Sequence, residues 1–161
     1  MENLNGLSHK KGSDAKPERL RGVHARKQGN AGAKQRMIRI LVAEDDDSMR
    51  QYLSRALERS GYEVVAVDRG TAALPYIAAE RFDLLLTDIV MPEMDGIELA
   101  QHVASVAPAT RVMFITGFAA VTLRAGRAVP EAKVLSKPFH LRDLVMEVDR
   151  IFGRDSASGL S

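Results

Sequence analysis

Short apolar runs alternate with longer segments of helical spacing along most of the chain. Five runs rich in Val, Ile and Leu predict strands, at residues 38–43, 62–67, 84–88, 111–116 and 133–135. Apolar residues that recur every three or four positions predict helices between and after them, at residues 48–60, 71–80, 97–106 and 141–152. This alternation predicts an α/β fold, a doubly wound five-stranded parallel sheet covered by helices on both faces.

Local signals set the ends of several helices. Ser48 is predicted to cap the first helix and Gly61 to end it. Pro75 lies near the start of the second helix, where we expect a local kink or a late start. Residues 119–129 contain Gly126 and precede a proline, so a helix in this stretch should be short or mobile.

The first 36 residues differ in composition from the rest of the chain. They carry nine Lys or Arg and three acids, hence +6, whereas the remainder carries 14 basic and 18 acidic residues, hence −4. They lack aromatic residues and periodicity, so we expect a disordered, solvated tail, or the product of an upstream start codon before Met37. No aromatic or amphipathic pattern accompanies the charge, which argues against nucleic-acid or membrane binding. The predicted domain is residues 37–152, followed by a flexible tail at 153–161.

The composition excludes several classes of protein. No apolar run approaches 18 residues and the N-terminus has no signal-peptide core, so we expect a cytoplasmic protein without a membrane span. The absence of cysteine excludes disulfides, thiol catalysis and Cys-based zinc sites. The four histidines are scattered, and His102 and His140 are interpreted as surface or capping residues.

Polar side chains follow four of the predicted strands at their carboxyl ends. The first strand ends at Glu44 and Asp45, the third at Asp88, the fourth at Thr116 and the fifth at Lys137. Parallel α/β sheets bind ligands at this edge. Three carboxylates there would repel one another unless a cation neutralised them, and oxygen ligands alone favour Mg²⁺. An aspartate beside such a metal, with a lysine opposite, is suited to accept a phosphoryl group.

Each residue also has a simpler interpretation when taken alone. Asp46 or Asp47 fits a helix cap, and Asp95 with the following glycine fits a turn. Thr116 could be a capping hydroxyl and Lys137 a solvated strand end. Their coincidence at successive strand ends favours a single site.

Four stretches together resemble the receiver domain of bacterial two-component response regulators. They are residues 40–46, 86–96, 114–117 and 136–139, within a resemblance that covers residues 37–152. The resemblance implies a flavodoxin-like, CheY-like sheet with strand order 2-1-3-4-5. It also implies a phosphoacceptor with at most weak self-catalysed phosphorylation and dephosphorylation, rather than an enzyme.

The resemblance implies a role for each acidic residue. Asp88 would be the phosphoacceptor. Asp45, Asp88 and the backbone carbonyl of Val90 would bind Mg²⁺ directly, and Glu44 would act through water.

The resemblance extends to the polar residues after the last two strands. Lys137 would contact the phosphoryl group, and Thr116 would turn toward it after transfer. Many receivers carry an aromatic residue three positions before the lysine, where this chain has Val134. We therefore expect the response to centre on residues 116–134 instead.

Residues 40–46, 114–121 and 132–141 are similar to those of CpdR-like stand-alone regulators. This similarity implies phosphorylation by a histidine kinase or a histidine phosphotransfer protein, and output through the ClpXP protease. The alternative is a single-domain receiver that serves as a phosphorelay intermediate or acts on another output protein.

Two other classes and one output mode fit less well. A haloacid-dehalogenase-type phosphatase needs a second Asp two residues after its nucleophile, but Val90 follows Asp88 at that distance. A flavodoxin-like cofactor binder needs a phosphate loop after the first strand, where residues 44–47 are all acidic. Too few residues follow Phe152 to form a DNA-binding helix-turn-helix.

Overall fold

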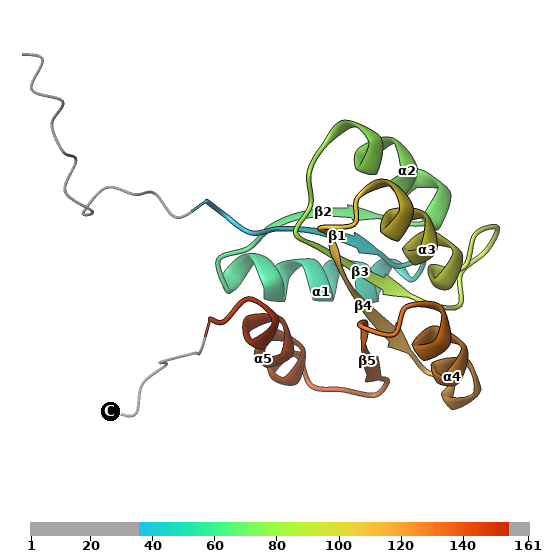
Figure 1. Cartoon of the computed structure of the whole chain (residues 1–161). Coiled ribbons are helices and arrows are strands. Elements are labelled where there is room, and N and C mark those ends of the chain that lie inside the picture. Colours follow the sequence, from blue (N-terminus) through green and yellow to red (C-terminus); the bar gives the residue numbers. More distant parts are fainter. Residues whose placement is uncertain (1–35, 155–161) are drawn as a thin grey trace, which may run out of the picture. The chain divides into compact units, whose positions relative to one another are not determined.

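The computed structural model describes residues 36–154, in which a parallel sheet lies between two layers of helices (Figure 1). The strands are β1 (Arg39–Ala43), β2 (Glu63–Val67), β3 (Leu84–Asp88), β4 (Arg111–Thr116) and β5 (Lys133–Ser136). The helices are α1 (Asp47–Arg59), α2 (Gly70–Ala79), α3 (Gly96–Val106), α4 (Ala119–Ala128) and α5 (Leu141–Ile151). The strand order is β2-β1-β3-β4-β5 and every pair is parallel, which confirms the predicted fold.

Each face of the sheet has its own hydrophobic core. Leu41 and Leu85 pack toward α2, α3 and α4, whereas the alternate residues Val42 and Leu86 pack toward α1 and α5. All four side chains are at most 1% exposed. Because neighbouring strand residues point to opposite faces, a sheet covered on both sides needs the continuously apolar strands that the sequence shows.

The reversal of strand order places two carboxyl strand ends at one crevice. From β1 the chain passes first to β2 on one side and then to β3 on the other. Ala43 pairs with Thr87 in the parallel register, so the next residues, Glu44 and Asp88, lie side by side. This is the topological switch point at which open α/β sheets bind ligands.

The start of α1 differs from the prediction. Asp46, not Ser48, is the N-cap: its backbone is extended and its carboxylate accepts a 2.7 Å hydrogen bond from the Met49 amide. Ser48 lies inside the first turn, where its hydroxyl is not placed to cap the free amides. The capping interpretation of Asp46 is thus confirmed. The helix ends at Arg59, just before Gly61 as predicted, and Gly61 has a positive φ of 89°.

Two helices with weak sequence signals form fully. The second, α2, begins at Gly70, so Pro75 lies in its interior and a late start is wrong. The fourth, α4, is a helix of ten residues despite Gly126. Two of the histidines, His102 and His140, lie at the surface, and His140 stands at the α5 N-cap position without a side-chain capping bond.

Charged residues stand at both ends of the described segment. Arg36 pairs with Asp83 at 2.6 Å, and the Arg154 guanidinium lies 4.8 Å from the centre of the Tyr62 ring. The predicted tails otherwise fall on residues 1–35 and 155–161, which lie outside the described residues. Within residues 36–154, no helix is long and apolar enough to cross a membrane.

Candidate metal and phosphoryl site

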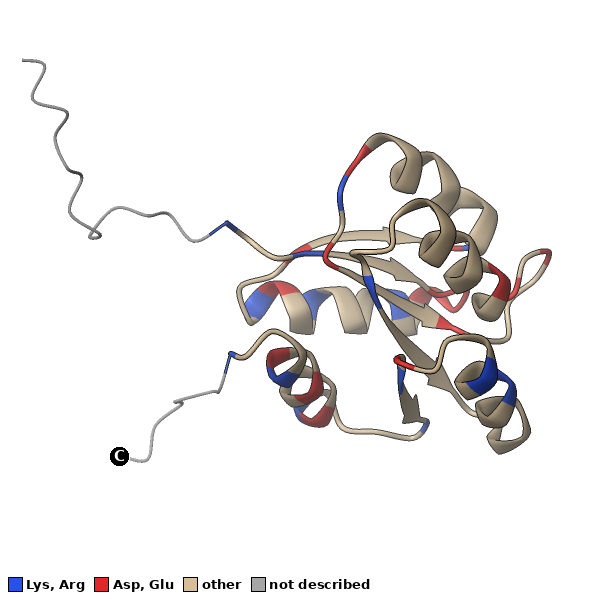
Figure 2. Ribbon diagram, in the orientation of Figure 1, with Lys and Arg blue, Asp and Glu red and all other residues tan. Residues whose placement is uncertain are grey.

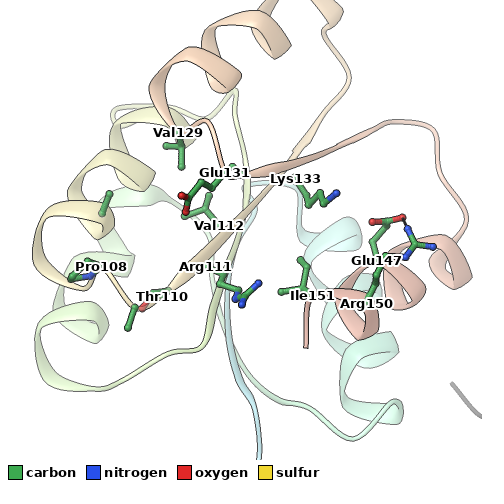
Figure 3. Close-up of a pocket in the computed structure, with 13 residues that line it drawn as sticks. Pro108, Thr110, Arg111, Val112, Val129, Glu131, Lys133, Glu147, Arg150 and Ile151 are labelled. Carbon is green, nitrogen blue, oxygen red and sulfur yellow. Dashed lines mark hydrogen bonds and ion pairs between the residues drawn. The ribbon is translucent and has the colours of Figure 1, made fainter. Parts of the chain in front are cut away.

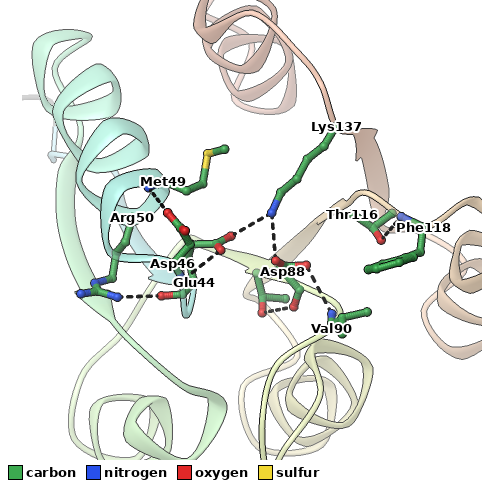
Figure 4. A network of polar contacts seen from close by, with 10 residues as sticks. Glu44, Asp46, Met49, Arg50, Asp88, Val90, Thr116, Phe118 and Lys137 are labelled. Atoms are coloured by element: carbon green, nitrogen blue, oxygen red, sulfur yellow. Dashed lines mark hydrogen bonds and ion pairs between the residues drawn. The ribbon is translucent and has the colours of Figure 1, made fainter.

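The acids predicted from the strand ends converge in space. Ligand oxygens of Glu44, Asp45 and Asp88 all lie within 4.8 Å of one another. The Lys137 ammonium lies 3.0 Å from Asp88 Oδ2 and 3.4 Å from Glu44 Oε2 (Figure 4). Acidic residues at the carboxyl ends of β1 and β3 form a red cluster in Figure 2. The structure thus brings together four of the predicted site residues.

Glu44 is held in place by contacts with both the sheet and the following loop. Its amide donates to the Val67 carbonyl at 3.1 Å, which continues the β1–β2 pairing by one residue. Its Oε1 accepts a 3.3 Å hydrogen bond from the Asp46 amide. The residue is only 1% exposed, so its carboxylate lies beneath the mouth of the site. Asp45, in contrast, is exposed and available to a ligand from solvent.

Asp88 depends on a close approach between β3 and α3. A Cβ atom at Gly96 would lie 2.0 Å from the Asp88 carbonyl oxygen, so no other residue fits without backbone movement. The Gly96 amide donates to the Ile89 carbonyl at 2.8 Å, and Asp95 caps α3 in a reciprocal capping box with Glu98. The predicted turn at Asp95 is therefore also the helix start that supports Asp88.

Two further contacts arrange the loop and the lysine around Asp88. The Val90 amide donates to Asp88 Oδ1 at 3.3 Å, so the residue predicted to supply a backbone ligand borders the carboxylate. Lys137 follows β5, and its own amide donates to the Thr116 carbonyl at 2.8 Å. This bond extends the β4–β5 pairing, and the lysine side chain reaches past β4 toward the acids at the ends of β1 and β3.

Thr116 lies at the same sheet edge but does not contact the acids. Its hydroxyl accepts a 3.1 Å hydrogen bond from the Phe118 amide, and the residue is 1% exposed. Figure 4 shows this pair beside the site, across from Asp88. The hydroxyl therefore braces the β4–α4 turn, but it does not cap α4, whose N-cap position is Phe118 and which has no side-chain capping bond.

The electrostatics of the site show an excess of negative charge. Burial, together with the nearby charge of Asp88, raises the pKa of Glu44 from 4.5 to about 7, and Lys137 offsets only part of this effect. Burial alone would lower the pKa of Lys137, but its interactions with Asp88 and Glu44 outweigh burial and raise it. The lysine is therefore cationic at neutral pH and the acids still lack full compensation.

This donor set fits Mg²⁺. The cluster offers carboxylate oxygens only, with no nitrogen or sulfur ligand among its three members. A small divalent cation would supply the missing positive charge. Glu44 is buried and hydrogen-bonded, which suits an indirect role, whereas Asp45 and Asp88 offer oxygens nearer the mouth.

A separate cavity of about 650 Å³ lies at the opposite end of the strands. Its lining includes Arg111, Val112 and Lys133 at the amino ends of β4 and β5, with Glu147 and Arg150 of α5 (Figure 3). None of the predicted site residues lines it. This cavity is therefore distinct from the acidic site.

Sequence reasoning missed two residues that support the acids. Gly96 has no side chain, which allows α3 to approach the Asp88 carbonyl closely. The only signal in the sequence is the Asp95-Gly96 pair, which alone predicts a turn. Arg50, the fourth residue of α1, donates to the Glu44 carbonyl. A cation four residues after the capping Asp46 could have indicated a contact with the acidic loop.

The fold and site define a phosphoacceptor of two-component signalling. The chain belongs to the response regulator receiver domain family, which residues 40–149 match. It is similar to the response regulator receiver protein CpdR of Brucella abortus (strain 2308), with 57% identity over 116 residues, or 71% of this chain and 97% of CpdR. It is also 40% identical over 114 residues to the response regulator protein FleR of Pseudomonas aeruginosa, a match that spans 24% of FleR.

Solved structures agree with this assignment. A CheY-like receiver domain protein from Methanospirillum hungatei JF-1 is 28% identical, with a TM-score of 0.69 over 77% of this chain and 100% of that one. A receiver protein from Sinorhizobium medicae WSM419 is 27% identical, with a TM-score of 0.67 over 74% of this chain and 98% of that one. The chain is thus a CpdR-like receiver, a phosphoacceptor rather than an enzyme, as predicted.

Proposed function

We propose that this protein is a stand-alone regulator that receives a phosphoryl group on Asp88 with the aid of Mg²⁺. The observation that carries the proposal is the position of the Asp88 carboxylate. It belongs to the acidic cluster and also lies 3.0 Å from the Lys137 ammonium. No other aspartate among the described residues has both neighbours.

The phosphodonor would be a phosphohistidine on a histidine kinase or a histidine phosphotransfer protein. An Asp88 oxygen forms the new O–P bond while the N–P bond breaks, and the departing imidazole takes up a proton. Bound Mg²⁺ supplies positive charge to the phosphoryl oxygens. Asp45 and Asp88, with the Val90 carbonyl, would hold this ion directly, and Glu44 would hold it through water.

The remaining polar residues act on the product. The Lys137 ammonium already contacts Asp88 and would pair with a phosphoryl oxygen once the acyl phosphate forms. Thr116 would exchange its bond with the Phe118 amide for one to the phosphoryl group. That exchange would release the β4–α4 turn and so pass the chemical change to α4.

Phosphorylation with a small donor tests the assignment. Wild-type protein incubated with acetyl phosphate and Mg²⁺ should gain the mass of one phosphoryl group, and base should remove it as it cleaves other acyl phosphates. Asp88→Asn should gain nothing. Asp83→Asn is the control for loss of an aspartate. Asp83 lies just before β3, at the opposite end of this strand from Asp88, and the variant should react like wild type. Stoichiometric acyl phosphate on Asp88→Asn would place the acceptor elsewhere.

The output would be a protein–protein interaction in the cytoplasm, directed at the ClpXP protease. Support comes from the 57% identity to CpdR over almost the whole of that protein. A pull-down should show ClpX retained by Asp88→Ala and by unphosphorylated wild type, and less by phosphorylated wild type. Retention of another partner, with no ClpX in any state, would favour a phosphorelay intermediate or a different output.

A further inference from the structure

Arg50 makes a forked contact with the loop that carries the metal ligands. One guanidinium nitrogen, Nη1, donates to the Glu44 carbonyl at 3.0 Å (Figure 4). The other, Nη2, donates to the Asp47 carboxylate. The backbone amide of Arg50 donates to the Asp46 carbonyl at 2.8 Å, which fixes the base of the side chain in α1. The Arg50 side chain is 20% exposed and the Asp47 side chain 81% exposed, so the arm to Asp47 lies at the surface whereas the arm to Glu44 reaches a buried residue.

The bonded carbonyl belongs to the peptide that joins the two neighbouring acids. Glu44 and Asp45 share this peptide, and its plane sets the direction in which the Asp45 side chain leaves the backbone. Contacts on either side hold the amide of Glu44 and the amide of Asp46. Among the described residues, Arg50 is the one donor recorded for the Glu44 carbonyl.

We propose that Arg50 is a positioning residue for the metal site, which fixes the Glu44–Asp45 peptide so that Asp45 points toward Asp88. The inference rests on the proposed function, since it assigns to this chain a site for Mg²⁺. A guanidinium can hold two acceptors at once in a rigid plane, whereas a lysine ammonium is a single flexible donor point. Outer contacts of this kind typically change metal affinity by about 10- to 100-fold.

The charge of Arg50 and its positioning role predict opposite effects on Mg²⁺ affinity, so the two explanations can be distinguished. Arg50 is cationic and close to the acidic loop, so through charge alone it would oppose binding of a second cation. Its removal would then tighten Mg²⁺ binding. If it acts through position, its removal weakens Mg²⁺ binding although a repelling charge has gone.

The experiment compares Arg50→Met with Arg50→Lys in the full chain. Arg50→Met removes fork and charge while keeping an apolar stem, and Arg50→Lys keeps the charge alone. Mg²⁺ affinity is measured by titration calorimetry, and the rate of phosphorylation by acetyl phosphate is measured over a range of Mg²⁺ concentrations. We expect both variants to bind Mg²⁺ about tenfold more weakly. Their maximal rates at saturating Mg²⁺ should stay near that of wild type.

Two further variants keep the test independent of folding. Arg55→Met removes an exposed cation from the same helix and should leave Mg²⁺ affinity unchanged. Asp47→Asn leaves Arg50 in place but weakens one arm of the fork, so a smaller loss of affinity is expected. Because Asp47→Asn also removes an acid near the site, Arg50→Lys, which keeps the charge, is the deciding variant if Arg50→Met does not fold.

The outcomes separate this inference from the proposed function. Unchanged or tighter Mg²⁺ binding in both Arg50→Lys and Asp47→Asn, with wild type phosphorylated normally, overturns the positioning role alone. A wild-type protein that neither binds Mg²⁺ nor gains an acyl phosphate overturns both.

Discussion

Replacement of Glu44 by glutamine should stabilise the metal-free protein at neutral pH. Burial and the neighbouring Asp88 raise the pKa of Glu44 from 4.5 to about 7 in the folded state. At about 1.4 kcal/mol for each tenfold change in protonation, this difference corresponds to roughly 3 kcal/mol of lost stability when the carboxyl is ionised. A buried, imperfectly paired amide would cost about 1 kcal/mol of this gain, so we expect Glu44→Gln to be about 2 kcal/mol more stable.

The effect should depend on pH with a defined sign. Below pH 4.5 the carboxyl of Glu44 is protonated in both the folded and unfolded states, so the wild type bears no ionisation cost. Since the folded-state pKa is the higher one, wild-type stability is lost as pH rises from 4.5 through about 7. The stability that Glu44→Gln gains over wild type should therefore be small near pH 4.5 and complete above about pH 7.

Urea unfolding with EDTA at about pH 5 and pH 8 measures this difference directly. Glu58→Gln, an exposed acid on α1, is the matched control and should show no comparable change. Adding Mg²⁺ should stabilise the wild type and narrow the gap, because ligand binding to the folded state adds to its stability. A gap between Glu44→Gln and wild type that is equal at both pH values, or a less stable variant at pH 8, would refute the reasoning.

Four other results should follow from the same geometry. Asp45→Ala should lose Mg²⁺ binding in calorimetry, and with it phosphorylation. Its urea midpoint should be equal to or above that of wild type, because removal of one carboxylate relieves repulsion within the acidic cluster. Gly96→Ala forces a Cβ to 2.0 Å from the Asp88 carbonyl oxygen and should cost about 1–3 kcal/mol in urea unfolding and slow phosphorylation; wild-type behaviour would contradict this close approach. Burial, helped by a hydrogen bond to an α5 carboxylate, raises the pKa of Tyr62 from 10 to about 12, so wild-type stability should fall between these pH values. A Tyr62→Phe protein should not show this fall. If urea unfolding gave the same dependence of stability on alkaline pH for wild type and Tyr62→Phe, the prediction would be wrong. Hydrogen exchange should change mainly in residues 116–134 on phosphorylation, also after truncation of the first 36 residues; changes confined to α1 and α2 would exclude this response.

The sequence predicted the parts of the structure that depend on periodicity. Apolar strands that alternate with helices predict a parallel sheet, and the polar residues that follow such strands then share one end of the sheet. The sequence alone therefore grouped Glu44, Asp45, Asp88 and Lys137. The helix starts were less certain, because Asp46 and Ser48 are both good caps and only the backbone conformation decides between them.

Other features depend on distances that no linear pattern encodes. The role of Gly96 lies in its approach to the Asp88 carbonyl, and that of Arg50 in the reach of one side chain back to the end of β1. The hydroxyl of Thr116 could be placed at the sheet edge from the sequence, but its bond to the Phe118 amide follows from a single torsion angle.

The two outer strands limit how this protein can recruit other molecules. Strand β5 has four residues and begins with the exposed Lys133, and β2 has five and begins with the exposed Glu63. Short edges with charged ends are poor templates for a further strand, so neither copies of the chain nor extended peptides gain much by adding to the sheet. Recognition is thereby left to the loops and helices, where a single acyl phosphate can alter the surface that a partner meets.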